Sequence, residues 1–216
     1  MICCNIMSNI SPSPDKNINY EIYNKQLAKA KQKRGNSMCM PLMNIRGKTA
    51  SEILHEVGVS GEIPVPLNPI LRHYGISAMP YDFTELEKSE ELVEFVAERG
   101  KILGIIISKD DYAGIFYRDS DTSYRQRFTI AHELGHCANA EEDIAEFIEF
   151  RQTVASDNVA EIAANTFAVE LLMPEEKLRA LYGAMPIPYA SLLAKAFAVS
   201  DNVMKARMKG LRLKYV

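Results

Sequence analysis

The stretch Arg127-Phe-Thr-Ile-Ala-His132-Glu133-Leu-Gly135-His136 contains the most informative pattern of this 216-residue chain. If it is helical, His132 and His136 lie on one face, because residues i and i+4 of a helix are neighbours. Both imidazoles can then bind one zinc ion, and Glu133 can hold and deprotonate a metal-bound water. With 4 His in the chain, about 0.006 chance matches to this pattern are expected. The stretch therefore predicts a zinc site with Glu133 as general base.

The flanking residues support a helix here. A polar cluster at 119–123 precedes it, and Ser123 followed by Gln126 has the form of a capping box. Apolar residues then recur at helical spacing. Gly135 destabilises a helix by about 1 kcal/mol relative to Ala, so we expect another backbone to pack closely beside it. A core helix with two incidental histidines is the alternative, but buried imidazoles without partners are unfavourable.

A catalytic zinc site usually has three protein ligands, and the sequence offers two candidates for the third. Glu142 occupies the position of the last His in the pattern H-E-x-x-H-x-x-G-x-x-H, with Asn139 in place of its Gly; a solvated acid is the preferred interpretation of this residue. Glu161 opens a run to Pro174 that predicts one helix. Asn165 shares a face with Glu161, so one of the two can bind the metal while the other holds a ligand histidine.

These motifs together resemble those of the ImmA/IrrE family of zinc metallopeptidases. The resemblance rests on residues 127–136 and on Glu161-x-x-Ala-Asn-x-Phe-Ala-x-x-Leu-Leu-Met-Pro174, and extends more loosely from about Val65 to Leu211. It implies that Glu161 is the third Zn²⁺ ligand beside the two histidines, as in thermolysin-like gluzincins. It also implies a regulatory endopeptidase whose protein substrate is a helix-turn-helix transcriptional repressor of a stress response or a mobile element.

A protein of a different class remains an alternative on the sequence alone. The metal could be structural in a regulatory binding protein, or in a toxin–antitoxin partner that binds without cutting. A purely structural site has no use for a carboxylate at position 133. The pattern therefore favours catalysis.

Composition indicates a cytoplasmic enzyme. The length suits one catalytic domain with a small appendage, and 47% hydrophobic residues suffice for a core. No run approaches the roughly 20 apolar residues of a membrane span, and the first residues lack the features of a signal peptide. The 4 Cys show no framework spacing, which favours reduced thiols. We expect Cys137 to be a small buried residue.

Three regions are expected along the chain. Residues 1–47 form a basic tail: through Lys48 there are 8 Lys and Arg against 2 acids, whereas the whole chain has a net charge of −3. A flexible, solvated tail is the simplest interpretation, and contact with nucleic acid or an acidic partner is the alternative. Residues 48–183 form the zincin-like metallopeptidase domain, and residues 184–216 a C-terminal helical segment.

The periodicity of the middle region predicts an α+β fold with a small antiparallel or mixed sheet and an active-site helix. We expect the segment that follows Leu92 to form a sheet edge that could hold a peptide substrate as an added strand. Helices are predicted at 51–57, 68–74 and 161–173, and strands at 75–79, 92–98, 102–108 and 114–118. Candidate donors to the oxyanion are Tyr112, Tyr117 and Tyr124, and none of them is assigned.

The last region predicts two amphipathic helices, 189–197 and 200–208, in a helix-turn-helix-like arrangement. Lys205, Arg207 and Lys209 lie on the second helix, where they could contact DNA. The preferred interpretation is a helical cap that completes the core, because basic residues also suit the negative end of a helix dipole.

Overall fold

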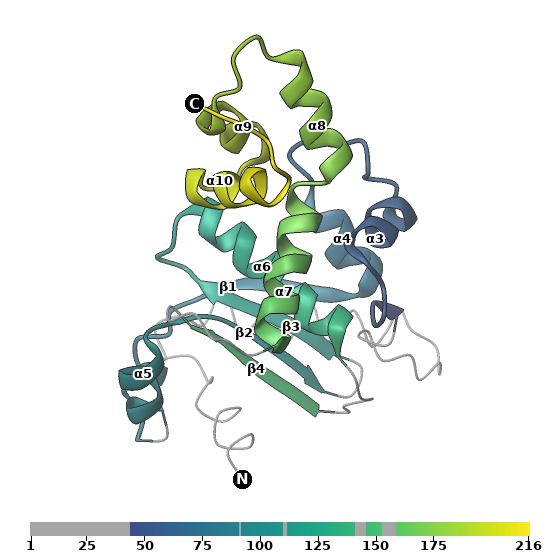
Figure 1. Ribbon diagram of the computed structural model, residues 1–216. Helices are drawn as coiled ribbons and strands as arrows, with labels where there is room; N and C mark the ends of the chain where they lie inside the picture. The colour runs from purple at the N-terminus through teal and green to yellow at the C-terminus, as the bar shows by residue number, and fades with distance from the viewer. Residues whose placement is uncertain (1–43, 91, 110–111, 141–145, 153–158) are drawn as a thin grey trace.

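The computed structural model describes residues 44–90, 92–109, 112–140, 146–152 and 159–216. Helices and strands combine in an α+β architecture, as predicted (Figure 1). In chain order the elements are α3 (Ala50–Val57), α4 (Leu67–Tyr74), β1 (Ile76–Tyr81), the 3₁₀ helix η3 (Leu86–Lys88), α5 (Val93–Arg99), β2 (Ile102–Lys109), β3 (Tyr112–Arg118), α6 (Ser123–Asn139), β4 (Glu146–Gln152), α7 (Val159–Leu172), α8 (Glu175–Ala184), α9 (Ala190–Phe197) and α10 (Asp201–Gly210).

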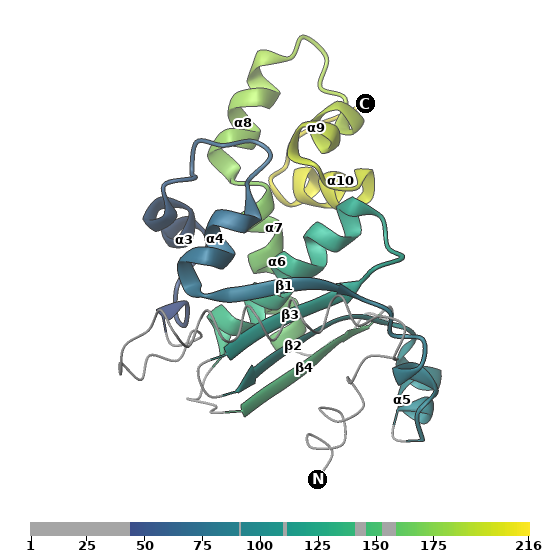
Figure 2. The ribbon, with the colours of Figure 1, turned by 180° about the vertical axis from the view of Figure 1, so that it is seen from behind.

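The sheet has four strands in the order β1-β3-β2-β4. β1 is parallel to β3, whereas β2 is antiparallel to both β3 and β4. Helices α6 and α7 pack against each other more extensively than any other helix pair. Figures 1 and 2 show these two helices over one face of the sheet, with α8, α9 and α10 beyond them and α5 at one end of the sheet. The helix pair α6–α7 is thus the middle layer of the molecule.

Two clusters of buried apolar side chains cover the two faces of the sheet. Ile106 and Ile115 belong to the larger cluster, which also contains buried residues of α6, α7 and the C-terminal helices. Ile105 and Ile107 belong to a smaller cluster around Phe83. Because successive side chains of a strand point to opposite faces, β2 contributes to both clusters and holds them together.

The prediction of a strand at 92–98 is wrong, because residues 93–99 form helix α5. Leu92 and Val96 both pack against the smaller cluster, and their spacing of four residues fits one face of a helix rather than alternation along a strand. Gly100 ends the helix by donating its N–H to the carbonyl of Val96. The expected sheet edge after Leu92 does not exist.

One edge of the sheet is instead β4, which the sequence analysis missed. The acidic stretch 141–146 leads into β4 and obscured the β-favouring sequence Phe147-Ile-Glu-Phe150. β4 pairs with β2 and with no other strand in the described part of the chain. The other predicted strands, at 75–79, 102–108 and 114–118, correspond to β1, β2 and β3.

Most of the predicted N-terminal tail lies outside the described residues. Of residues 1–47 only 44–47 are described, and these contact the end of α6. Ile45 is fully buried, Arg46 Nε donates to the carbonyl of Ala140 at 2.9 Å, and the backbone N–H of Gly47 donates to the carbonyl of Ala138 at 2.8 Å. The segment before α3 is therefore joined to the histidine helix.

The two C-terminal helices form as predicted. The side chain of Ser200 caps α10, and Ala198 adopts the left-handed conformation between the helices. Arg207 is not on an exposed basic face with Lys205 and Lys209, which are both exposed. Burial lowers the pKa of its guanidinium, a shift that the nearby acids Glu170 and Glu175 oppose. This geometry favours the helical cap over a DNA-reading helix. None of the helices within the described ranges is long and apolar enough to span a bilayer.

Candidate metal centre

The N-cap of helix α6 lies one residue before Ser123, the cap that the sequence indicated. Thr122 is the N-cap, and its hydroxyl accepts a hydrogen bond from the backbone three residues later. Ser123 is already the first helical residue. The side chain of Gln126 does not return to the cap but donates to the carbonyls of Arg118 and Asp119, at 3.3 and 3.0 Å. These bonds fix the start of α6 to the end of β3.

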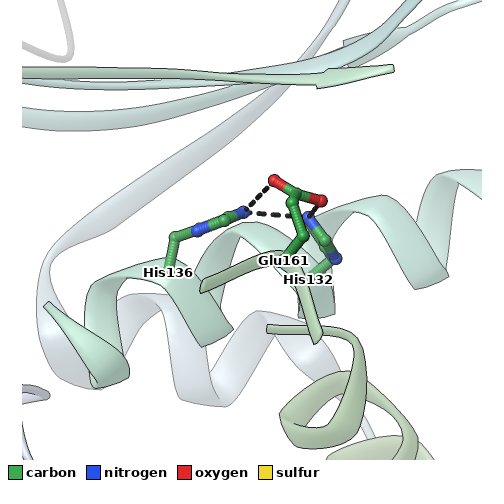
Figure 3. Close-up of side chains that lie close together, drawn as sticks. All are labelled: His132, His136 and Glu161. Carbon is green, nitrogen blue, oxygen red and sulfur yellow. Dashed lines mark hydrogen bonds and ion pairs between the residues drawn. The ribbon is translucent and has the colours of Figure 1, made fainter. Parts of the chain in front are cut away.

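Three polar side chains from α6 and α7 converge at one point (Figure 3). The Nε2 atoms of His132 and His136 lie 2.9 Å apart. Glu161 places Oε1 at 3.1 Å from Nε2 of His136 and Oε2 at 3.3 Å from Nε2 of His132. Both imidazoles are buried, with relative exposures of 0% and 6%. The ligand-type atoms of the three residues lie within 4.8 Å of one another.

Asn165 holds the imidazole of His132 from the other side. Its Oδ1 lies 3.1 Å from Nδ1 of His132, and because an amide oxygen only accepts, Nδ1 carries the proton and donates. The second nitrogen of that ring, Nε2, then presents a lone pair to the cluster. The sequence left open which of Glu161 and Asn165 reaches the metal position and which holds a histidine. The geometry places Glu161 in the cluster and Asn165 behind His132.

The donor set fits a divalent transition metal. Burial raises the pKa of the Glu161 carboxyl, but the neighbouring imidazoles of His132 and His136 outweigh this effect and hold the pKa well below its usual range. Glu161 is therefore a carboxylate. An acceptor nitrogen of His132 faces a second imidazole nitrogen and this carboxylate, so a cation at their centre would satisfy all three. Two imidazole nitrogens and one carboxylate are a common catalytic zinc set.

Glu133 is fully buried on α6, immediately after the first histidine of the cluster. It is not one of the three clustered residues. Cys137 lies one turn later, is buried as predicted, and donates its thiol hydrogen to the carbonyl of Glu133 at 3.2 Å. Burial, and secondarily the negative charge of Glu133, raise the pKa of this thiol well above its ordinary value. Cys137 is thus a neutral packing residue.

Gly135 allows the two helices to approach closely, as the sequence predicted. A Cβ at this position would lie 2.8 Å from the carbonyl oxygen of Ala164 and 2.9 Å from its Cα, both backbone atoms of α7. Real Cβ atoms essentially never come this close to other atoms. Only glycine at this position permits the spacing that brings Glu161 to the histidines.

Some residues that the sequence suggested for the site are not among the three of this cluster. Glu142, the alternative third ligand, lies outside the described residues. Tyr124 is 38% exposed in the first turn of α6, eight residues before His132.

A residue that the sequence analysis missed is Gly104 of β2, which lies directly against Glu133. An isolated glycine inside a predicted strand often marks a close approach of two backbones, and this signal was available in the sequence.

Comparison with protein families identifies the domain that contains this cluster. The family model described as the IrrE N-terminal-like domain, peptidase family M78, matches residues 96–209, more than half of the chain. The matched segment includes both helices of the cluster. No curated protein gives a significant match to the sequence. The resemblance seen in the two motifs is therefore confirmed: the chain belongs to the M78 peptidase family of IrrE N-terminal-like domains.

Proposed function

We propose that this protein is a zinc-dependent endopeptidase in which His132, His136 and Glu161 hold Zn²⁺ and Glu133 is the general base. The observation that carries the proposal is the convergence of two imidazole nitrogens and an ionised carboxylate next to a buried glutamate. Membership of a peptidase family supports it.

The residues divide the chemistry between them. Zinc, when bound, would supply a Lewis acid that polarises the scissile carbonyl and increases the acidity of a water molecule. The carboxylate of Glu133 takes a proton from the attacking water and passes it to the nitrogen of the leaving amine. Asn165 keeps His132 in the tautomer whose Nε2 is free to bind metal.

The substrate is proposed to bind as an extended segment along the edge strand β4. A peptide can add to the free side of an edge strand through backbone hydrogen bonds. β4 takes the place of the edge that the sequence analysis expected after Leu92.

We propose a helix-turn-helix transcriptional repressor as the substrate and the cytoplasm as the location. Both ideas rest on the resemblance between this sequence and the ImmA/IrrE family. Such an enzyme must spare other proteins, so its specificity should depend on a folded partner. Purified protein should make a single cut in the cognate repressor and leave casein intact. Efficient degradation of casein would instead identify a general peptidase.

The mechanism is tested by separating metal binding from catalysis. Glu133→Gln should keep close to one zinc per chain, because Glu133 is not a ligand, and should lose repressor cleavage by several orders of magnitude. His136→Ala should lose the zinc as well. If the Gln variant cleaves at the wild-type rate, Glu133 is not the base. A wild-type protein that binds zinc and the repressor without cutting would favour a binding protein with a structural metal.

The third ligand is tested with a matched pair of variants. Glu161→Ala should strongly lower zinc affinity, whereas Glu142→Ala should leave it unchanged. The opposite pattern would assign the third ligand to Glu142.

A further inference from the structure

Strand β2 approaches the proposed general base at a residue without a side chain. A Cβ at Gly104 would lie 2.9 Å from Oε1 of Glu133 and 2.4 Å from Cγ2 of Thr129. Glu133 and Thr129 are both fully buried on α6. Neither side chain can therefore move aside into solvent, and the backbone of Gly104 forms one wall of the space that holds the Glu133 carboxylate.

An irregularity in β2 places Gly104 at this wall. Ile102 is opposite Gln152 of β4, but Gly104 is opposite Arg151, so β2 has one extra residue at this point. In a regular strand Ile102 and Gly104 would face the same side. Ile102 instead packs in the smaller cluster, whereas Gly104 faces α6. Such bulges reverse the alternation of a strand and often occur next to active sites.

A buried ion pair holds the strand at the bulge. The carboxylate of Glu87 accepts a hydrogen bond from the backbone N–H of Ile102 at 2.7 Å. Nε of Arg118 donates a hydrogen bond to the backbone carbonyl of Ile102 at 2.8 Å. Arg118 also forms an ion pair with Glu87, and both side chains are largely buried. Both backbone groups of Ile102 are thus fixed two residues before Gly104.

We propose that Gly104 is a positioning residue that sets the place of the Glu133 carboxylate relative to the metal position. This inference rests on the proposed function, in which Glu133 is the base. Any side chain at position 104 would displace that carboxylate, while the two histidines and Glu161 would remain in place on their helices. Metal binding and the position of the base should therefore respond separately to a substitution at this glycine.

The test uses the full chain loaded with Co²⁺ and the ligand acetohydroxamic acid, followed by visible absorption. A metal-bound hydroxamic acid can give its proton to a nearby carboxylate, so its affinity reports where Glu133 lies. Gly104→Ala should keep one metal per chain and bind acetohydroxamic acid about 10- to 100-fold more weakly, as expected for the loss of one hydrogen bond to a charged group. Glu133→Gln should show a similar loss. Unchanged affinity in Gly104→Ala would overturn the proposal.

A matched control separates a local effect from a general effect of adding a methyl group. A Cβ at Gly183 of α8 would meet nothing within 4 Å, so Gly183→Ala should match the wild type in metal content and affinity. An equal loss of affinity in Gly183→Ala would contradict the proposed role of Gly104.

A double variant separates displacement of Glu133 from crowding of Thr129. Thr129→Ser removes the Cγ2 atom that gives the closest contact but keeps the hydroxyl. Gly104→Ala combined with Thr129→Ser should therefore regain unfolding stability and still bind acetohydroxamic acid weakly. If Gly104→Ala alone does not fold, the affinity for acetohydroxamic acid is measured on this double variant instead. Recovery of wild-type affinity in the double variant would show that Thr129 packing was responsible and would overturn the proposal.

The outcome is distinguishable from a failure of the proposed function. If no repressor is cleaved, yet acetohydroxamic acid binding depends on both Glu133 and Gly104, the peptidase proposal fails and the positioning role stands. If repressor is cleaved normally by Gly104→Ala with normal acetohydroxamic acid affinity, the positioning role fails and the peptidase proposal stands.

Discussion

Asn165 supports the metal cluster by its hydrogen bond with His132, so its effect can be measured apart from the ligands themselves. Replacing it with Ala would free the imidazole to rotate or change tautomer. Loss of such a supporting hydrogen bond typically lowers metal affinity about 10- to 100-fold. We expect this loss for Asn165→Ala in a zinc competition titration with a chelator.

Two variants control this measurement. Asn165→Asp keeps an oxygen acceptor and should retain most of the affinity. Thr166→Ala changes the next exposed residue of α7, whose hydroxyl only bonds to the carbonyl of Ile162, and should have no effect. Equal affinities for wild type and Asn165→Ala would show that His132 is held by the surrounding packing alone.

Local periodicity predicted that His132 and His136 share a site, whereas the choice of Glu161 as the third residue rested on the resemblance to the ImmA/IrrE family. The spacing of four residues between His132 and His136, and again between Glu161 and Asn165, places each pair on one helix face wherever the helix lies. Gly104 could not be assigned in this way. Its role depends on a bulge in β2 and on the contact of that strand with α6, and both are set by tertiary packing.

At the scale of elements, the contact between α6 and α7 determines whether Glu161 reaches the histidines. Gly135→Ala would place a methyl group against the backbone of Ala164, which has no flexible side chain to yield. The helices must then separate, and overpacking of this kind destabilises a protein by about 1–3 kcal/mol. We expect lower zinc affinity together with a lower free energy of unfolding, measured by urea titration with and without zinc. Unchanged values for both would mean that the helices can part without moving Glu161.

Helices α3 and α4 are joined by one carboxylate, which makes their contact sensitive to pH. Glu56 accepts hydrogen bonds from Lys48 at 2.5 Å, His73 at 3.0 Å and Tyr74 at 3.1 Å. The hydrogen bond from Lys48, followed by that from His73, lowers the pKa of Glu56 from 4.5 to about 2. Since the pKa is depressed in the folded state, this carboxylate stabilises the fold above pH 4.5, and the effect is lost as the pH falls toward about 2.

Glu56→Gln should therefore lower the urea midpoint at pH 7, and the difference from wild type should shrink as the pH falls below 4.5. The exposed Glu62→Gln, between the same two helices, is the control and should match the wild type throughout. A difference between Glu56→Gln and wild type that stayed constant from pH 7 to pH 3 would show that the effect is not due to ionisation of Glu56.

The errors of the sequence analysis at this scale concern short segments. The apolar residues of 92–98 are compatible with a strand or a helix, and the acidic residues before β4 obscured its β-favouring sequence. Leu92 and Val96 became one helix face because both meet the smaller cluster, and β4 became a strand because β2 offers it a partner. In contrast, α3 and α10 begin at side-chain caps, α4 and α9 end at left-handed residues, and the sequence placed all four within one or two residues.

At the scale of the whole molecule, the C-terminal helices pack against the layer that contains the metal cluster. Leu171 and Leu172 of α7 are fully buried in the same apolar cluster as Phe197, Met204 and Met208 of the last two helices. Figures 1 and 2 show α9 and α10 beyond α6 and α7, on the side away from the sheet. The helical cap is thus part of the support of the helix that carries Glu161.

Arg207 is the polar residue at this junction, and it allows the cap to be distinguished from a DNA-binding helix. Burial lowers the pKa of its guanidinium and the nearby Glu170 of α7 and Glu175 of α8 oppose this shift, whereas Lys205 is exposed. Arg207→Ala would remove packing by the half-buried aliphatic stem and a positive charge near Glu170, while Glu175 would keep its ion pair with Arg179. We expect a loss of unfolding free energy on the order of 1 kcal/mol, and almost none for Lys205→Ala, by urea titration. The opposite outcome would be equal stability of Lys205→Ala and Arg207→Ala, with both variants binding a DNA duplex more weakly than wild type and with the steep salt dependence of phosphate contacts. The last helix would then be a nucleic-acid surface rather than a support for α7.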